Sequence, residues 1–197
     1  MARADLAPGK STAAGLDAWI VFEDESAATL NPALRTTWAP RGHTPRITAS
    51  ASRKKTSMAG WCCYRTGRTP RLMFTLRPDG HFTAVDFPDL LRRLRRFLGT
   101  RVVLVWDNLT GHIRDLGVRA FIRENADWLT VYQLPGYAPE LNPVEGLWGE
   151  LKNGLLANLT ARTLDEVTTT ARHGLRLVQY QPDLLNGFLA ETELALN

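Results

Sequence analysis

The chain has 197 residues, which is enough for one domain or two small ones. Apolar residues make up 44% and charged residues 22% of the chain, and these ordinary shares exclude a wholly disordered protein. The formal net charge of +4 favours an anionic partner such as nucleic acid, and it fits a merely soluble basic protein equally well.

The two cysteines, Cys62 and Cys63, are adjacent in an apolar run. Neighbouring cysteines rarely form an unstrained disulfide, so we expect both to pack as thiols in a strand. The sequence has no Cys/His spacing typical of zinc sites, no apolar signal core and no run long enough to cross a bilayer. These features predict a reducing, cytoplasmic compartment.

The first half of the chain contains short apolar, β-branched runs separated by turn residues, a pattern typical of antiparallel strands. The predicted elements are a flexible N-terminal tail at residues 1–17, strands at 18–22, 57–64 and 71–76, and a hairpin with a turn over 35–48.

From Asp86 onward the apolar residues recur with a helical period. Asp86 is placed to cap the first of these helices, and Gly99 is placed to end it. Further elements are predicted as strands at 102–106 and 129–134 and helices at 113–125, 143–156, 163–179 and 182–193. The order of elements predicts an α/β fold, a mixed sheet with helices on its faces.

Two acids follow apolar strands, Asp24 after residues 18–22 and Asp107 after residues 102–106. If the strands are neighbours, the carboxylates lie side by side and repel each other, and a divalent cation such as Mg²⁺ relieves that repulsion. Two alternatives stay open. Asp107 with Asn108 also fits an Asx turn, and Asp24 is the middle one of three consecutive acids at 23–25.

A third acid, Glu145, stands in the first turn of the helix predicted at 143–156. Asn142 is placed as its N-cap and Pro143 as its first residue. The spacing also matches a capping box, in which the Glu145 carboxylate only serves the helix start. Either role keeps the carboxylate on a rigid first turn.

Three segments resemble the signature blocks of DDE transposases. They read DES at 24–26, WDNLTGH at 106–112 and YAPELNPVEGLWGELK at 137–152. They are similar to the mariner-like superfamily, and more so to its bacterial insertion-sequence branch, which WAPRG at 38–42 also resembles. The resemblance covers residues 18–160, and the 38-position step from Asp107 to Glu145 fits it.

The resemblance implies a ribonuclease H-like fold, a mixed five-stranded sheet flanked by helices. It implies a catalytic domain at 18–160, with C-terminal helices at 161–197 packed on it. It maps the catalytic and metal-binding acids onto Asp24, Asp107 and Glu145. It further implies DNA strand cleavage and strand transfer during transposition, at TA dinucleotides, with two Mg²⁺ or Mn²⁺ ions about 4 Å apart. One ion activates water or a DNA 3′-hydroxyl, and the other stabilises the leaving oxygen.

Basic side chains are the candidates for DNA contacts, and a solvated loop is the alternative for most of them. These candidates are His112, Arg41, Arg53, Lys54 and Lys55. Transposases of this type carry N-terminal helix-turn-helix modules. About 23 residues precede Asp24, so we expect that module as a separate or frameshift-fused partner. We also expect the active protein to be a dimer and to act at the nucleoid. The rival functions are an inactive remnant or non-catalytic DNA-binding domain, and a nuclease that cuts without joining.

Overall fold

In a computed structural model of the chain, the described residues are 13, 15, 17–31, 33–46, 52–106, 115–135 and 138–193. They form one five-stranded sheet with the strand order β3-β2-β1-β4-β5. The strands are β1 (Trp19–Thr29), β2 (Lys55–Tyr64), β3 (Arg71–Pro78), β4 (Val102–Trp106) and β5 (Leu129–Gln133). The first three pair antiparallel, whereas β4 runs parallel to both β1 and β5.

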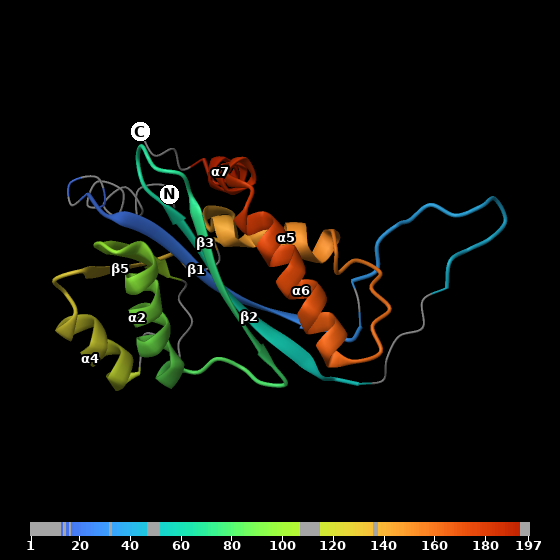
Figure 1. Cartoon of the computed structure of the whole chain (residues 1–197), viewed down its shortest axis with the longest axis horizontal. Helices are drawn as coiled ribbons and strands as arrows, with labels where there is room; N and C mark the ends of the chain where they lie inside the picture. The colour runs from blue at the N-terminus through green and yellow to red at the C-terminus, as the bar shows by residue number, and fades with distance from the viewer. Residues whose placement is uncertain are drawn as a thin grey trace.

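Helices cover both faces of this sheet (Figure 1). One face carries α5 (Pro143–Asn153), α6 (Leu164–Gln179) and α7 (Pro182–Glu191), and the other carries α2 (Phe87–Leu98) and α4 (Leu116–Glu124). Two short 3₁₀ turns, η2 (Ala84–Asp86) and η3 (Pro139–Leu141), lead into α2 and α5. The predicted mixed α/β sheet is therefore the observed architecture.

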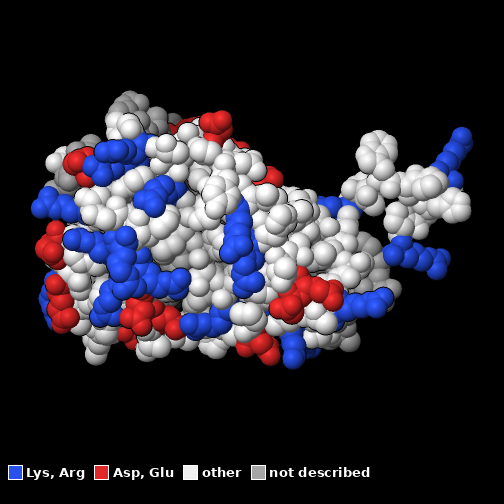
Figure 2. Space-filling view, in the orientation of Figure 1, with Lys and Arg blue, Asp and Glu red and all other residues white. Residues whose placement is uncertain are grey.

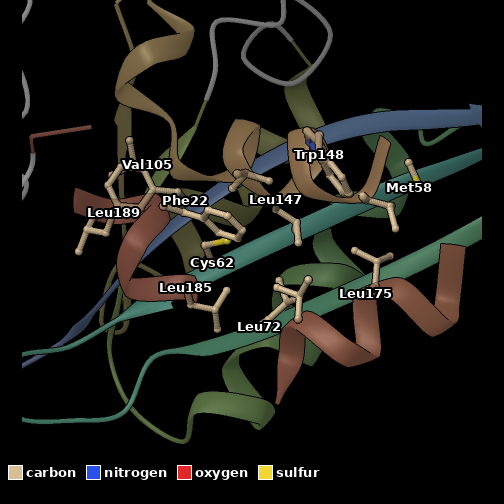
Figure 3. Close-up of a cluster of buried hydrophobic side chains, with 14 of the residues drawn as sticks. Phe22, Met58, Cys62, Leu72, Val105, Leu147, Trp148, Leu175, Leu185 and Leu189 are labelled. Atoms are coloured by element: carbon tan, nitrogen blue, oxygen red, sulfur yellow. The ribbon is translucent and has the colours of Figure 1, made fainter. Parts of the chain in front are cut away.

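Alternation along the strands divides the buried side chains between two cores. Phe22, Cys62 and Val105 belong to the core under α5, α6 and α7 (Figure 3), whereas Val21, Trp61 and Leu104 belong to the core under α2 and α4. The five residues of β4 are all buried, as expected for a strand between two parallel neighbours. The central strands are thus held from both sides, and the side chains at their ends are presented from a rigid base.

Both cysteines are free thiols in β2, as predicted. Burial raises the pKa of Cys62 to about 12 and also raises the pKa of Cys63. A thiol that stays protonated is a poor nucleophile and a poor metal ligand. The pair therefore serves packing.

The helix predicted from Asp86 is present as α2, and Gly99 ends it with a left-handed φ of 74°. Asp86 stands at the predicted N-cap position of α2, but its side chain makes no cap hydrogen bond to that helix and its dihedrals are helical. Its carboxylate instead accepts from the guanidinium of Arg77 and from the backbone N–H of Thr83. These contacts hold the pKa of Asp86 well below its usual range and tie β3 to the start of α2.

The hairpin predicted over 35–48 is wrong for the residues that the structure describes, because 33–46 contain no strand. The predicted turn is there, with the His43 N–H donated to the Pro40 carbonyl at 3.0 Å and Gly42 at a φ of 85°. Proline lacks the N–H that a strand ladder requires, and Pro40 and Pro45 flank the turn. The segment 33–46, here called the arm, extends away from the body of the molecule (Figure 1).

The remaining predicted helices lie close to their expected bounds. Within the region predicted as a helix at 113–125, α4 begins after Asp115, whose side chain accepts from the Val118 N–H at 3.0 Å. Thr163 is the N-cap of α6, and its side chain accepts the Glu166 N–H at 3.2 Å. No helix in the described part of the chain is long and apolar enough to cross a membrane.

Candidate active site

Asp24 projects from β1 towards α5. Its facing partner in the register is Gly60 of β2, and the same face carries the buried Phe22 and Cys62. Glu23 and Glu25 face Trp61 and Ala59, which belong to the core on the opposite side. Because neighbouring residues of a strand point to opposite faces, only the middle acid of the three lies on the α5 side. The strand register thus singles out Asp24, which the sequence pattern left open.

The first turn of α5 stands against β1 just before Asp24. Asn142 accepts the Val144 N–H on its side chain at 3.1 Å, as predicted for an N-cap. Its side-chain nitrogen lies 3.5 Å from the carbonyl oxygen of Glu23, a weak contact that nevertheless fixes which strand the helix start adjoins. The predicted cap is confirmed, and the structure adds its contact with β1.

Glu145 lies at the third position of α5 with an exposed side chain. In a capping box its carboxylate would accept the backbone N–H of Asn142. That N–H is instead donated to the Pro139 carbonyl at 2.9 Å. The start of α5 is therefore capped by the Asn142 side chain, and the backbone N–H of Asn142 is satisfied within the η3 turn. The Glu145 carboxylate is not needed for capping.

Trp148 connects α5 to Asp24. Its indole Nε1 donates to Asp24 Oδ2 at 2.8 Å, and the side chain is only 2% exposed. Glu145 precedes Trp148 by three residues, which is about 4.5 Å along the helix axis. The structure therefore places Asp24 against the N-terminal turns of α5 that carry Glu145. The acid pattern of the sequence does not include Trp148.

Asp107 and His112 lie outside the described residues. Strand β4 is described to Trp106, the residue directly before Asp107, and it runs parallel to β1 with Val105 opposite Phe22. Among the residues that the structure describes, no group of three or more His, Cys, Asp or Glu side chains is placed to hold a metal ion.

The predicted DNA-contacting residues on described segments lie at the arm and at the start of β2. Arg41, Arg53, Lys54 and Lys55 are all exposed, and Lys54 lies 3.6 Å from the carboxylate of Asp79. Lys55 pairs with Thr29, five residues along β1 from Asp24, which corresponds to about 17 Å. These cations are therefore separate from the acids, on the side from which the arm projects.

A second group of Lys and Arg side chains, mixed with acids, covers the end of the molecule that carries α2 and α4 (Figure 2). Two of these arginines stack on aromatic rings, Arg92 over Phe121 and Arg95 over Trp128, each 4.9 Å from the ring centroid. Such stacking stabilises the packing of α2 against its neighbours. We therefore assign Arg92 and Arg95 to the fold and not to the acid site.

Residues 19–168 match the family model described as DDE superfamily endonuclease. The chain belongs to this family. The matched segment of the DDE endonuclease begins with β1, so it includes both Asp24 and the helix α5 that carries Glu145 and Trp148.

A curated relative of this DDE endonuclease is the insertion element IS630 uncharacterized 39 kDa protein of Shigella sonnei. It is 26% identical over 165 residues, which cover 83% of this chain and 46% of the relative. The chain thus spans about half the length of the relative it matches.

Solved structures share the fold. The mariner Mos1 paired end complex with Mg superposes with a TM-score of 0.63 at 20% identity, covering 90% of this chain and 54% of the other. The Mos1 strand transfer complex gives 0.53 at 21% identity, over 90% and 56% of the two chains. The predicted ribonuclease H-like fold is confirmed by this likeness and by the observed sheet.

Proposed function

We propose that this DDE endonuclease is the catalytic domain of a transposase that cuts DNA strands and joins them to a target. The observation that carries the proposal is the hydrogen bond from Trp148 to Asp24, which places a strand acid against the helix that presents Glu145. A related insertion-element protein and the Mos1 complexes support the same function.

The acids suit a divalent cation. The carboxylates of Asp24 and Glu145 supply hard oxygen ligands, and α5 and β1 are held together by a buried contact. We propose Asp107 as the third ligand, because it directly follows Trp106 on a strand parallel to β1. Solved Mos1 structures with Mg and with Mn support Mg²⁺ or Mn²⁺ as the cation, and two ions is the proposed number.

Divalent cations at such a site supply charge neutralisation at the phosphate and acidify the attacking hydroxyl. The chain's own contribution is positional. Asp24 accepts a hydrogen bond from a buried indole, and Glu145 stands on a capped first turn. A carboxylate that is already in place loses little freedom when the reacting phosphate arrives, which is the main advantage of a rigid site.

DNA is the proposed substrate and partner. Arg41, Arg53, Lys54, Lys55 and His112 are the proposed phosphate contacts, so binding should weaken steeply as salt rises. The match covers only 46% of the curated relative and 54% of the Mos1 chain. We therefore propose that an additional helix-turn-helix segment or partner recognises the element ends. We further propose that the active form is a dimer and that it acts at the nucleoid in the cytoplasm.

The test uses two DNA substrates in Mn²⁺, a supercoiled plasmid and a labelled duplex with a free 3′-hydroxyl end. A transposase nicks the plasmid and also joins the labelled duplex to it. Nicking without joined product would leave a nuclease that only hydrolyses. DNA binding without either reaction would leave a non-catalytic domain. Ca²⁺ in place of Mn²⁺ and Glu145→Gln are the controls for chemistry that depends on the acids.

A further inference from the structure

We propose that Trp148 is a positioning residue for Asp24, and that Gly60 leaves the space in which the Trp148 indole packs. The indole N–H holds one carboxylate oxygen, so Asp24 meets a divalent cation in a single orientation. The inference rests on the proposed function, because it assigns Asp24 as a cation ligand. It adds a residue that the acid pattern does not contain.

The first support is the contact itself. Trp148 Nε1 lies 2.8 Å from Asp24 Oδ2, and a hydrogen bond to a carboxylate is stronger than one between neutral groups. Burial alone does not produce such a bond in this chain. Trp61 is also fully buried, yet its Nε1 has no hydrogen-bond acceptor in the part of the chain that the structure describes.

The second support is the space that Gly60 leaves beneath the indole. Gly60 faces Asp24 across the β1–β2 pair. A Cβ at position 60 would stand 3.0 Å from Cη2 and 3.1 Å from Cζ2 of Trp148, closer than side-chain carbons normally approach. A glycine within a strand often marks the close approach of another group. Here the missing side chain leaves room for the indole to lie over β2 while its nitrogen reaches β1 (Figure 3).

These contacts have a consequence for the carboxylate. The terminal torsion of an aspartate is broad, and the indole N–H restricts it by holding one carboxylate oxygen of the half-buried Asp24. An indole packed by α5 and two strands has little freedom and imposes its own geometry. Removing a group that orients a metal ligand typically costs about 10- to 100-fold in metal affinity.

The experiment measures Mn²⁺ affinity without catalysis, from the paramagnetic resonance signal of unbound Mn²⁺. Trp148→Phe removes the N–H and should raise the dissociation constant about 10-fold. The matched control is Trp61→Phe, which changes an equally buried tryptophan whose N–H has no acceptor in the described structure. It should bind Mn²⁺ as the wild type does.

A second pair of variants keeps Trp148 and tests the space that Gly60 leaves for its indole. Gly60→Ala places a methyl group against the indole and should also weaken Mn²⁺ binding about 10-fold. Gly149→Ala is its control on α5, because a Cβ there meets nothing within 4 Å. Circular dichroism without metal verifies that each variant is folded.

Nuclear magnetic resonance tests the contact directly. The indole N–H signal absent from Trp148→Phe belongs to Trp148, and Asp24→Asn should shift it more than the signals of the other tryptophans. Trp148→Phe binding Mn²⁺ like Trp61→Phe, or an unshifted signal, would overturn the inference, whereas the proposed function would still be decided by the nicking and joining assay. A wild type that neither binds Mn²⁺ nor cuts DNA would overturn both.

Discussion

Functional side chains are presented in opposite ways at two places in the molecule. One is the contact between α5 and β1 around Asp24 and Trp148, here called the corner, and the other is the arm at 33–46. At the corner, Leu147 and Trp148 are 0% and 2% exposed, and the indole reaches across β2 to Asp24. On the arm, Leu34 is 71% and Trp38 is 100% exposed. The corner is held by packing, whereas the arm projects from the body (Figure 1).

The attachment of the arm is local. Asn158, in the loop after α5, donates its side-chain N–H to the Arg35 carbonyl and accepts the Arg35 N–H, both at 2.9 Å. Its own N–H is donated to Ala33 at 3.1 Å. Asp24 is therefore held by a contact with the packed core, whereas the arm is held by hydrogen bonds at its base.

The largest effect should come from the core of the corner. Leu147→Ala removes a fully buried side chain and should lower the free energy of unfolding by about 2–5 kcal/mol. Leu34→Ala, on the arm, should change it by less than about 0.5 kcal/mol. Urea unfolding followed by circular dichroism measures both. Equal losses would mean that the arm packs as firmly as the corner.

The next effect separates chemistry from stability at the same corner. Asp24→Asn should reduce DNA nicking at least about 100-fold, because a charged ligand is replaced by a neutral amide. Mn²⁺ at about 100 times its dissociation constant should stabilise the wild type by about 2.7 kcal/mol and should not stabilise this variant. Thermal unfolding with and without Mn²⁺ gives the second value.

The control for that experiment is Asp89→Asn, which changes an acid whose side chain is 82% exposed on α2. It should keep both the nicking rate and the Mn²⁺ effect. If Asp24→Asn behaves like Asp89→Asn, then Asp24 is not a cation ligand, and the corner is only part of the core.

The smallest effect should come from the arm base. Asn158 has a φ of 54°, so Asn158→Gly keeps that backbone conformation accessible while removing the side-chain amide. We expect a loss of about 1–2 kcal/mol in local stability, seen as faster hydrogen exchange of the Arg35 amide, with little change in global unfolding. Exchange that accelerates equally in β1 would show that the arm and the sheet unfold together.

Much of the fold was predictable because its signals are local. The all-apolar run of β4, the helical period of α2 and the Asn142 cap each depend on a few neighbouring residues, and each prediction is confirmed. The hairpin prediction failed over the described residues 35–46, because Pro40 and Pro45 beside the turn lack the N–H groups that a strand ladder requires. The position of Asp86 before α2 was predictable from local sequence, but its side-chain partner Arg77 comes from β3, which no local pattern reveals.

The candidate site divides in the same way. The sequence by itself placed Asp24 after an apolar strand run and Glu145 in the first turn of a helix, and it singled out Asp107 and His112, whose roles stay predictions. Only the tertiary structure decided that Asp24 is the acid facing α5, that the capping box does not use Glu145, and that Trp148 bonds Asp24 above Gly60. The physical reason is separation along the chain. Capping and strand patterning act over a few residues, whereas Asp24 and Trp148 are 124 positions apart and meet only when the sheet and α5 pack together.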